Sequence, residues 1–75
     1  MKLKVGKKYI TRDGEYYAEI THNDGSGYMP FIGVIYPIGD AIPYDDPKDS
    51  WDEDGGYMPF GKYTLDLVEE YNPPL

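Results

Sequence analysis

Cysteine is absent from this 75-residue sequence, so neither a disulfide nor a thiolate zinc site can stabilise the fold. Long apolar runs are absent too. None approaches the roughly 20 residues that a membrane-spanning helix needs, and no apolar core follows the basic opening residues, as it would in a signal peptide. We therefore expect no membrane segment and no secretion signal, with the cytoplasm as the default location. No Gly-x-Gly-x-x-Gly or P-loop spacing occurs, which leaves nucleotide binding through a glycine cradle unsupported.

Histidine and serine, which serve as base and nucleophile in many enzymes, are sparse. His22 is the only histidine, and the serines that could pair with it as nucleophiles are Ser26 and Ser50. Because it lies beside a glycine-rich segment, we interpret His22 as a solvated loop residue. The adjacent carboxylates Glu69 and Glu70 would point to opposite faces of a strand, so they would not pair as acid and base. We expect neither enzymatic activity nor a bound cofactor.

The acidic stretch before Gly55 invites comparison with an EF-hand calcium loop. Aligning Gly55 with the sixth position of that loop places Asp52 third and Asp54 fifth, but Ser50 first and Gly61 twelfth. The first position needs a carboxylate and the twelfth needs a bidentate glutamate, so the pattern fails at both. We predict no metal site and interpret these acids as a solvated charge run.

The formal net charge is −7, and the two signs are separated along the chain. All 14 acidic residues lie at or after Asp13, where only Lys48 and Lys62 oppose them. The remaining basic residues, which all precede Asp13, are Lys2, Lys4, Lys7, Lys8 and Arg12. A strongly acidic surface repels phosphates, so we expect no direct binding of DNA or RNA. The same charge favours a basic protein partner, including one that normally holds nucleic acid, although solubility alone would also explain it.

Hairpin turns and alternating apolar residues occupy much of the chain. Asp-Gly pairs, such as Asp13-Gly14, supply the positive φ that tight hairpins require. After that turn, Tyr16, Ala18 and Ile20 fall on one face of an extended segment. The segments that we predict as strands are residues 3–11, 15–21, 28–36, 57–60 and 63–69.

This pattern predicts an all-β fold of five to six short strands, either a small antiparallel sheet or a partly open, SH3-like barrel. A chain of 75 residues supports one core, so we expect a single domain over residues 1–75. Prolines and acids predict an irregular acidic loop at residues 36–50, and residues 71–75 are expected to form a C-terminal tail. The predicted core residues are Phe31, Phe60, Ile32, Val34, Leu65 and Leu67.

One five-residue phrase occurs twice. Residues 27–31 read Gly-Tyr-Met-Pro-Phe and return unchanged at residues 56–60, each time close behind an Asp-Gly pair. We expect two similar hairpin corners, whose phenylalanines enter the core and whose prolines mark the entry to a strand. We therefore interpret the repeat as a structural device that brackets the acidic, proline-broken stretch. That stretch is the better candidate for function.

The sequence has too many aromatic rings for a core of this size to bury them all: 9 tyrosines, 2 phenylalanines and 1 tryptophan. Tyrosine and tryptophan dominate the hot spots of protein interfaces, and aromatic anchors in an acidic field suit a basic partner. The predicted partner-binding residues lie in or beside the acidic loop. They are Tyr36, Tyr44, Asp45, Asp46, Asp49, Trp51, Asp52, Glu53 and Asp54.

Both ends of the chain carry short motifs. They are Val5-Gly6-Lys7-Lys8-Tyr9, Thr11-Arg12-Asp13-Gly14, Asp54-Gly55 before an aromatic residue, Gly61, and Asp66-Leu67-Val68-Glu69-Glu70 before Tyr71. In these motifs the chain resembles small accessory proteins encoded by tailed phages and prophages. The resemblance implies a phage origin, the cytoplasm of a bacterial host and action on host machinery, but it supplies no activity. The doubled phrase and the long proline-acid loop lie outside it.

Together these features lead us to expect a phage accessory protein that binds a host protein with a basic surface and inhibits or redirects it. A nucleic-acid-handling or defence complex is the expected target class. One alternative is a module that binds a small, nucleotide-type ligand, with positive charge from the basic opening segment and Lys62. Another is a structural or assembly component of the virion, in which exposed sheet edges pair between chains to form a homo-oligomer.

Overall fold

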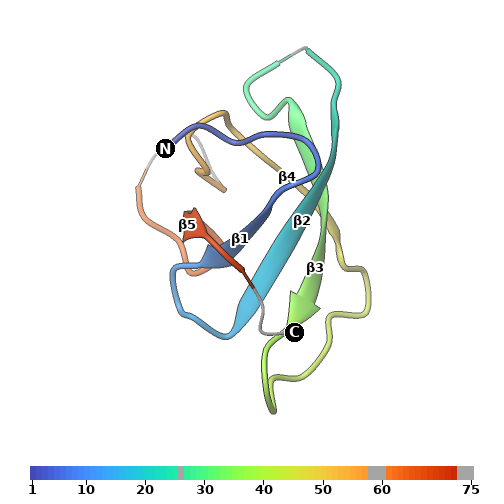
Figure 1. The fold of residues 1–75 in the computed structure, drawn as a ribbon, viewed down its shortest axis with the longest axis vertical. Helices are drawn as coiled ribbons and strands as arrows, with labels where there is room; N and C mark the ends of the chain where they lie inside the picture. The colour runs from blue at the N-terminus through green and yellow to red at the C-terminus, as the bar shows by residue number, and fades with distance from the viewer. Residues whose placement is uncertain (26, 58–60, 73–75) are drawn as a thin grey trace.

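The computed structural model describes residues 1–25, 27–57 and 61–72. Their regular structure consists of strands alone, arranged as shown in Figure 1. The strands are β1 (Lys8–Thr11), β2 (Tyr16–Asn23), β3 (Phe31–Pro37), β4 (Lys48–Trp51) and β5 (Leu67–Glu70). Within those ranges the chain contains no helix that is long and apolar enough to cross a membrane. The predicted all-β fold is confirmed.

The five strands form one open antiparallel sheet in the order β4-β3-β2-β1-β5. Its centre is the long β2–β3 hairpin, in which Tyr16 is opposite Pro37 and Asn23 is opposite Phe31. The edge strands β4 and β5 do not pair with each other, but a backbone hydrogen bond of 2.7 Å from Leu67 N to the carbonyl of Gly55 joins β5 to the segment after β4. The observed form is therefore the open sheet.

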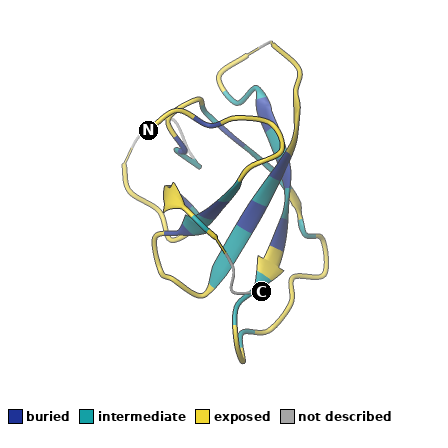
Figure 2. Ribbon diagram, viewed as in Figure 1, coloured by how far each residue is buried: buried dark blue, intermediate teal, exposed yellow. Residues whose placement is uncertain are grey.

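Alternation along the strands sends one set of side chains into a single core. Figure 2 shows buried positions recurring along β2 and β3. The buried apolar residues are Leu3, Tyr9, Ala18, Ile20, Phe31, Ile35, Trp51 and Leu67. Burying this set is the main favourable contribution to folding in a chain without cross-links.

The core differs from the predicted one along β3. Phe31 is buried, so Gly33 and Ile35 share its face, and Ile32 and Val34 lie half-buried on the other face of the sheet. The prediction that Ile32 and Val34 belong to the core is therefore wrong, because the period-2 alternation counted from Phe31 selects Ile35 instead. Leu67 is buried and Leu65 packs half-buried against the core, whereas predicted Phe60 lies outside the described residues.

Three predicted strands begin at least three residues later than expected, and the one predicted from residue 28 begins at Phe31. The first starts at Lys8, because Gly6 adopts a φ of 90° and the preceding residues form a turn, although Leu3 still reaches the core. The last starts at Leu67, because Asp66 N donates to the carbonyl of Tyr63 at 3.0 Å and closes a turn where a strand was predicted. The predicted strand over residues 57–60 falls mostly outside the described residues.

The segments predicted to be irregular are partly ordered by strands. β3 extends to Pro37 and β4 starts at Lys48, so the irregular stretch is narrower than residues 36–50 at both ends. Tyr71, which was placed in the tail, donates its N–H to the carbonyl of Lys8 at 2.8 Å and continues the pairing of β5. His22 was interpreted as a solvated loop residue; it is exposed, but it lies within β2 and not in a loop.

Candidate partner-binding surface

Trp51 was predicted to contact a partner, and its position in the structure makes this wrong. Its side chain is 0% exposed, it lies opposite Phe31 in the β3–β4 pair, and its indole Nε1 donates to the carbonyl of Leu65 at 2.8 Å. Every polar atom of the indole is therefore satisfied inside the protein. Trp51 is therefore a fully buried core residue and is not exposed to a partner.

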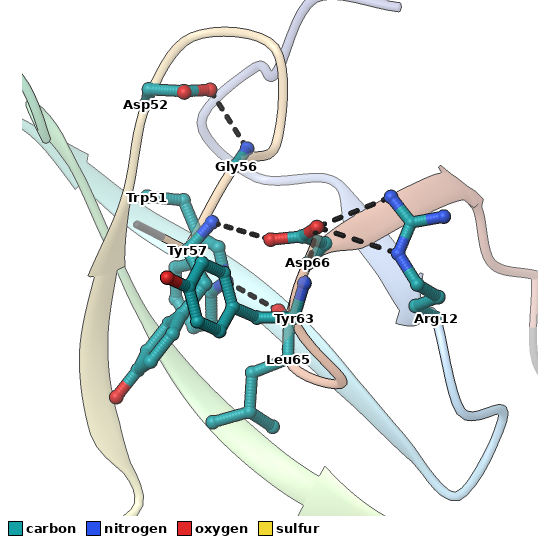
Figure 3. A network of polar contacts seen from close by, with 8 residues as sticks. All are labelled: Arg12, Trp51, Asp52, Gly56, Tyr57, Tyr63, Leu65 and Asp66. Carbon is teal, nitrogen blue, oxygen red and sulfur yellow. Dashed lines mark hydrogen bonds and ion pairs between the residues drawn. The ribbon is translucent and has the colours of Figure 1, made fainter. Parts of the chain in front are cut away.

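Asp66 fixes the segments that surround Trp51 (Figure 3). Its Oδ1 accepts the backbone N–H of Tyr57 at 2.8 Å, its Oδ2 accepts that of Tyr63 at 2.9 Å, and the Arg12 guanidinium lies 3.1 Å from Oδ2. Burial raises the pKa of this carboxyl, but the two N–H groups and Arg12 outweigh burial and hold the pKa below its ordinary value of 3.8. The ionised carboxylate thereby positions the Tyr57 backbone.

Asp52, another predicted contact residue, is occupied by its own turn. Its Oδ1 accepts the N–H group of Asp54 at 2.9 Å. It also accepts that of Gly56 at 2.7 Å, as Figure 3 shows. Within that turn Gly55 has a φ of 95°, and a side chain there would collide with the carbonyl of Leu67. The Asp-Gly-Gly sequence thus meets a local backbone requirement, and it brings Tyr57 to the side of Trp51, with 6.5 Å between ring centroids.

Tyr44 is held on the surface by the β1–β2 turn and the start of β2. Its ring centroid lies 4.7 Å from that of Tyr16, whose hydroxyl donates to the carbonyl of Ile42 at 2.6 Å. A backbone hydrogen bond of 2.9 Å from Ile38 to Glu15 fastens the start of the same loop. Tyr44 nevertheless remains 39% exposed, so it is an ordered aromatic ring that a partner can touch.

Carboxylates gather around this exposed ring. Burial raises the pKa of Tyr44 first, followed by the charge of Tyr16 and then by the carboxylates of Asp13, Glu15 and Asp49. The pKa of Tyr57 is also raised, chiefly because its hydroxyl is hydrogen-bonded to Asp49. The three carboxylates contribute a negative potential at the Tyr44 ring, while burial remains the largest cause of its raised pKa. We call this surface the Tyr44 patch; its residues are Asp13, Glu15, Tyr16, Tyr44, Asp49 and Tyr57.

Glu53 and Asp54 belong to a different part of the surface. Lys2 Nζ lies 3.1 Å from Glu53 Oε1 and 3.0 Å from Asp54 Oδ1, so both carboxylates already have a cation beside them. With Asp52 they line a hollow of about 350 Å³ together with Gly27, Tyr28 and Pro30 of the first repeat. We call it the acidic hollow.

The two copies of the repeat are not equivalent where they can be compared. Tyr28 of the first copy is 86% exposed at the rim of the acidic hollow, and Phe31 of the same copy is buried. Tyr57 of the second copy is half-buried against the core, and residues 58–60 lie outside the described part. Phe31 and Pro30 have the positions predicted for them, with Pro30 directly before β3.

Tyr36 lies on the other face of the sheet from Tyr44. Its parity along β3 places it with Ile32 and Val34, and its ring stacks on Tyr17 at 5.2 Å. Tyr17 in turn stacks on Tyr71 at 4.9 Å. The predicted contact residues therefore do not form one surface: Tyr44 and Asp49 lie together, with Asp45 and Asp46 exposed next to Tyr44 in the chain.

The sequence did not indicate four members of the Tyr44 patch, namely Asp13, Glu15, Tyr16 and Tyr57. Three of them belong to the hairpin turn and the strand that follows it, where Asp13 was read only as a turn residue. The signal that was available is the density of acids and aromatics on both sides of that turn. This density indicates a surface only once the loop at residues 38–44 is known to pack against the hairpin turn and the start of β2.

No group of three or more histidine, cysteine, aspartate or glutamate side chains in residues 1–25, 27–57 and 61–72 is arranged to hold a metal ion. His22 contacts the hydroxyl of Thr21, with Nδ1 at 2.8 Å from Oγ1.

Compared with known proteins, the chain matches no family model, and no curated protein or solved structure matches it at a significant level.

Proposed function

We propose that this protein is an accessory protein that binds a basic surface of a host protein through the Tyr44 patch and thereby inhibits or redirects it. The observation that carries the proposal is an exposed, firmly held tyrosine, Tyr44, in the field of three carboxylates. Enzymatic chemistry has no part in it, and neither does direct contact with nucleic acid.

An arginine or lysine side chain of the partner fits this arrangement. A cation over the face of an exposed tyrosine contributes about 0.5–1 kcal/mol. The surrounding carboxylates, Asp13, Glu15 and Asp49, add charge complementarity, which chiefly increases the rate of association and selects against acidic partners. A partner with a cluster of basic side chains is therefore favoured over one with a single cation.

The patch is also organised before binding. Tyr16 holds Tyr44 by ring contact and holds the neighbouring loop by its hydrogen bond to Ile42, while Asp49 Oδ1 accepts the backbone N–H of Ser50 at 2.9 Å. Side chains that are already ordered lose little conformational entropy on association. This favours the Tyr44 patch over the acidic hollow, where Lys2 would first have to leave Glu53 and Asp54.

The class of target and the setting follow from charge and from the resemblance of the two ends of the chain to phage accessory proteins. A net charge of −7 allows carboxylates to occupy a basic groove where phosphates otherwise sit. Proteins with such grooves handle nucleic acid or belong to defence complexes that do. In a phage-encoded protein, the binding takes place in the cytoplasm of the bacterial host.

Affinity capture from a bacterial lysate tests the proposal when two tyrosines are compared. Tyr44→Ala removes the exposed ring of the patch, and Tyr36→Ala removes a ring of nearly equal exposure, 38% against 39%, from the opposite face. We expect the Tyr44 variant to lose a basic partner that the wild type and the Tyr36 variant both retain. Retention by the Tyr44 variant, or loss through Tyr36, would show that the patch is not the binding surface.

A further inference from the structure

A second hollow, of about 510 Å³, is lined mainly by basic side chains, although the chain as a whole is acidic. The residues that line it are Met1, Lys2, Lys4, Lys7, Tyr9 and Glu70. Its size falls within the range of about 300–1,000 Å³ that is typical of small-molecule sites. Three lysines around one hollow in a protein of net charge −7 require a physical account.

The backbone that carries these lysines is fixed. Leu3 is buried, and its N–H donates to the carbonyl of Glu53 at 2.9 Å. Lys7 N donates to the carbonyl of Lys4 at 3.2 Å and closes a turn, and Gly6 N donates to the carbonyl of Ile20 at 2.8 Å. Lys4 and Lys7 therefore project from the two ends of an anchored turn.

Tyr9 supplies a neutral donor to the same hollow. Its ring is buried, and its hydroxyl oxygen accepts the backbone N–H of Lys4 at 2.9 Å. That contact uses the oxygen as an acceptor, and among the described residues no acceptor is assigned to the hydroxyl hydrogen. A phenol O–H and ammonium groups are all hydrogen-bond donors, so the hollow offers donors to an anion.

The three lysines differ in whether they already form ion pairs with carboxylates of the protein. Lys2 is paired with Glu53 and Asp54, and Lys7 Nζ lies 3.2 Å from Glu70 Oε1. Lys4 makes no ion pair with any described residue. A singly charged anion would have to compete with these carboxylates on equal terms, whereas an anion of two or more charges can hold Lys4 and attract Lys2 and Lys7 as well.

We propose that this lysine hollow is a binding site for a multiply charged phosphate, such as a pyrophosphate group, either free or as part of a nucleoside polyphosphate. The donors in the lining would bind the phosphate groups of such a ligand. Tyr9, the sole aromatic residue in the lining, is buried, so no exposed ring is offered for a base to stack on. The site is independent of the Tyr44 patch, which shares no residue with it.

Titration calorimetry of the full chain at low salt, without divalent cations, tests this with pyrophosphate, inorganic phosphate and a nucleoside triphosphate as probes. We expect saturable binding of pyrophosphate with a Kd of about 1 mM or tighter, similar binding of the triphosphate, and weaker binding of inorganic phosphate. Stronger binding of the triphosphate alone, with none of pyrophosphate, would overturn the proposal, because recognition would then lie in the base. Absence of binding by all three would overturn it as well.

A comparison of two exposed lysines distinguishes binding in this hollow from a general effect of positive charge. Lys4→Gln removes the free ammonium of the hollow, and Lys48→Gln removes one from β4, at the other edge of the sheet. Neither lysine has an ion pair among the described residues, so both variants are expected to fold, which circular dichroism would verify. We expect roughly tenfold weaker pyrophosphate binding for Lys4→Gln and little change for Lys48→Gln. Equal weakening by the two would show a non-specific charge effect and contradict the proposal.

Discussion

Asp66 Oδ1 accepts the backbone N–H of Tyr57 at 2.8 Å and so connects the start of β5 to the segment after β4 (Figure 3). These two segments belong to opposite edges of an open sheet, whose edge strands do not pair with each other. The contact therefore joins the two edges of the sheet at one point, as strand pairing would join them along their length in a closed barrel. Because it also fixes Tyr57, it supports one wall of the Tyr44 patch.

Asp66→Asn is expected to destabilise the protein by about 2–4 kcal/mol, since a buried carboxylate that serves two N–H groups and a cation is replaced by a neutral amide. Arg12→Gln should cost less than about 1 kcal/mol, because the Arg12 side chain is 44% exposed and its ion pair is screened by water. Urea denaturation followed by circular dichroism measures both. A larger loss for Arg12→Gln would show that the ion pair, and not the backbone hydrogen bonds, carries the stability.

Acid should remove the contribution of Asp66 in a defined window. The folded-state pKa lies below the ordinary value of 3.8, so the stabilisation is complete above that value and is lost as the pH falls through the folded-state pKa. The difference in unfolding free energy between the wild type and Asp66→Asn should therefore shrink as the pH is lowered below about 4. A difference that stays constant, or grows in acid, would contradict the assignment.

Trp51→Phe should reduce stability by about 2 kcal/mol or more, because it shrinks a fully buried ring and leaves the carbonyl of Leu65 without its donor. Tyr44→Phe, which keeps an exposed ring and removes only its hydroxyl, should change stability by less than about 0.5 kcal/mol. Thermal and urea unfolding provide the comparison. A neutral Trp51→Phe variant would place the indole outside the core.

Two glycines with positive φ should respond differently to alanine. At Gly55 a β-carbon meets the carbonyl of Leu67, whereas at Gly39, with a φ of 61°, it meets no atom within 4 Å. Gly39→Ala should therefore carry only the backbone strain of about 1 kcal/mol, and Gly55→Ala should cost clearly more, because β5 has to move. Equal losses in the two variants would mean that the Gly55–Leu67 approach contributes nothing.

Sequence reasoning succeeded where local rules decide the structure. Alternation placed Tyr16, Ala18 and Ile20 on one face, and Asp13-Gly14 formed the predicted turn, with a φ of 74° at Gly14. These features depend on neighbours in the chain. The all-β fold follows from them, because such hairpins pair strand with strand.

The candidate surface depends on contacts that are distant in sequence, and the sequence does not contain them in readable form. Tyr36 and Tyr44 look alike beside the acidic loop, yet the parity of β3 sends Tyr36 to the reverse face. Trp51 resembled an interface anchor because acidic residues flank it in the sequence. Its pairing with Phe31, which is distant in the chain, becomes visible only in the fold. Asp66 looked like one residue of a strand, and only the fold reveals its contact with Tyr57.

The most direct test of the account is the salt dependence of binding to an arginine-rich peptide, compared between Glu15→Gln and Glu69→Gln. Both glutamates are exposed and free of side-chain ion pairs within the described residues, but Glu15 belongs to the Tyr44 patch and Glu69 lies on β5. Fluorescence titration would measure binding from about 0.01 M salt, where the Debye length is about 30 Å, to about 0.15 M, where it is about 8 Å. We predict that Glu15→Gln weakens binding and flattens its salt dependence, while Glu69→Gln follows the wild type. Identical curves for the two variants would contradict the claim that the Tyr44 patch receives a basic partner.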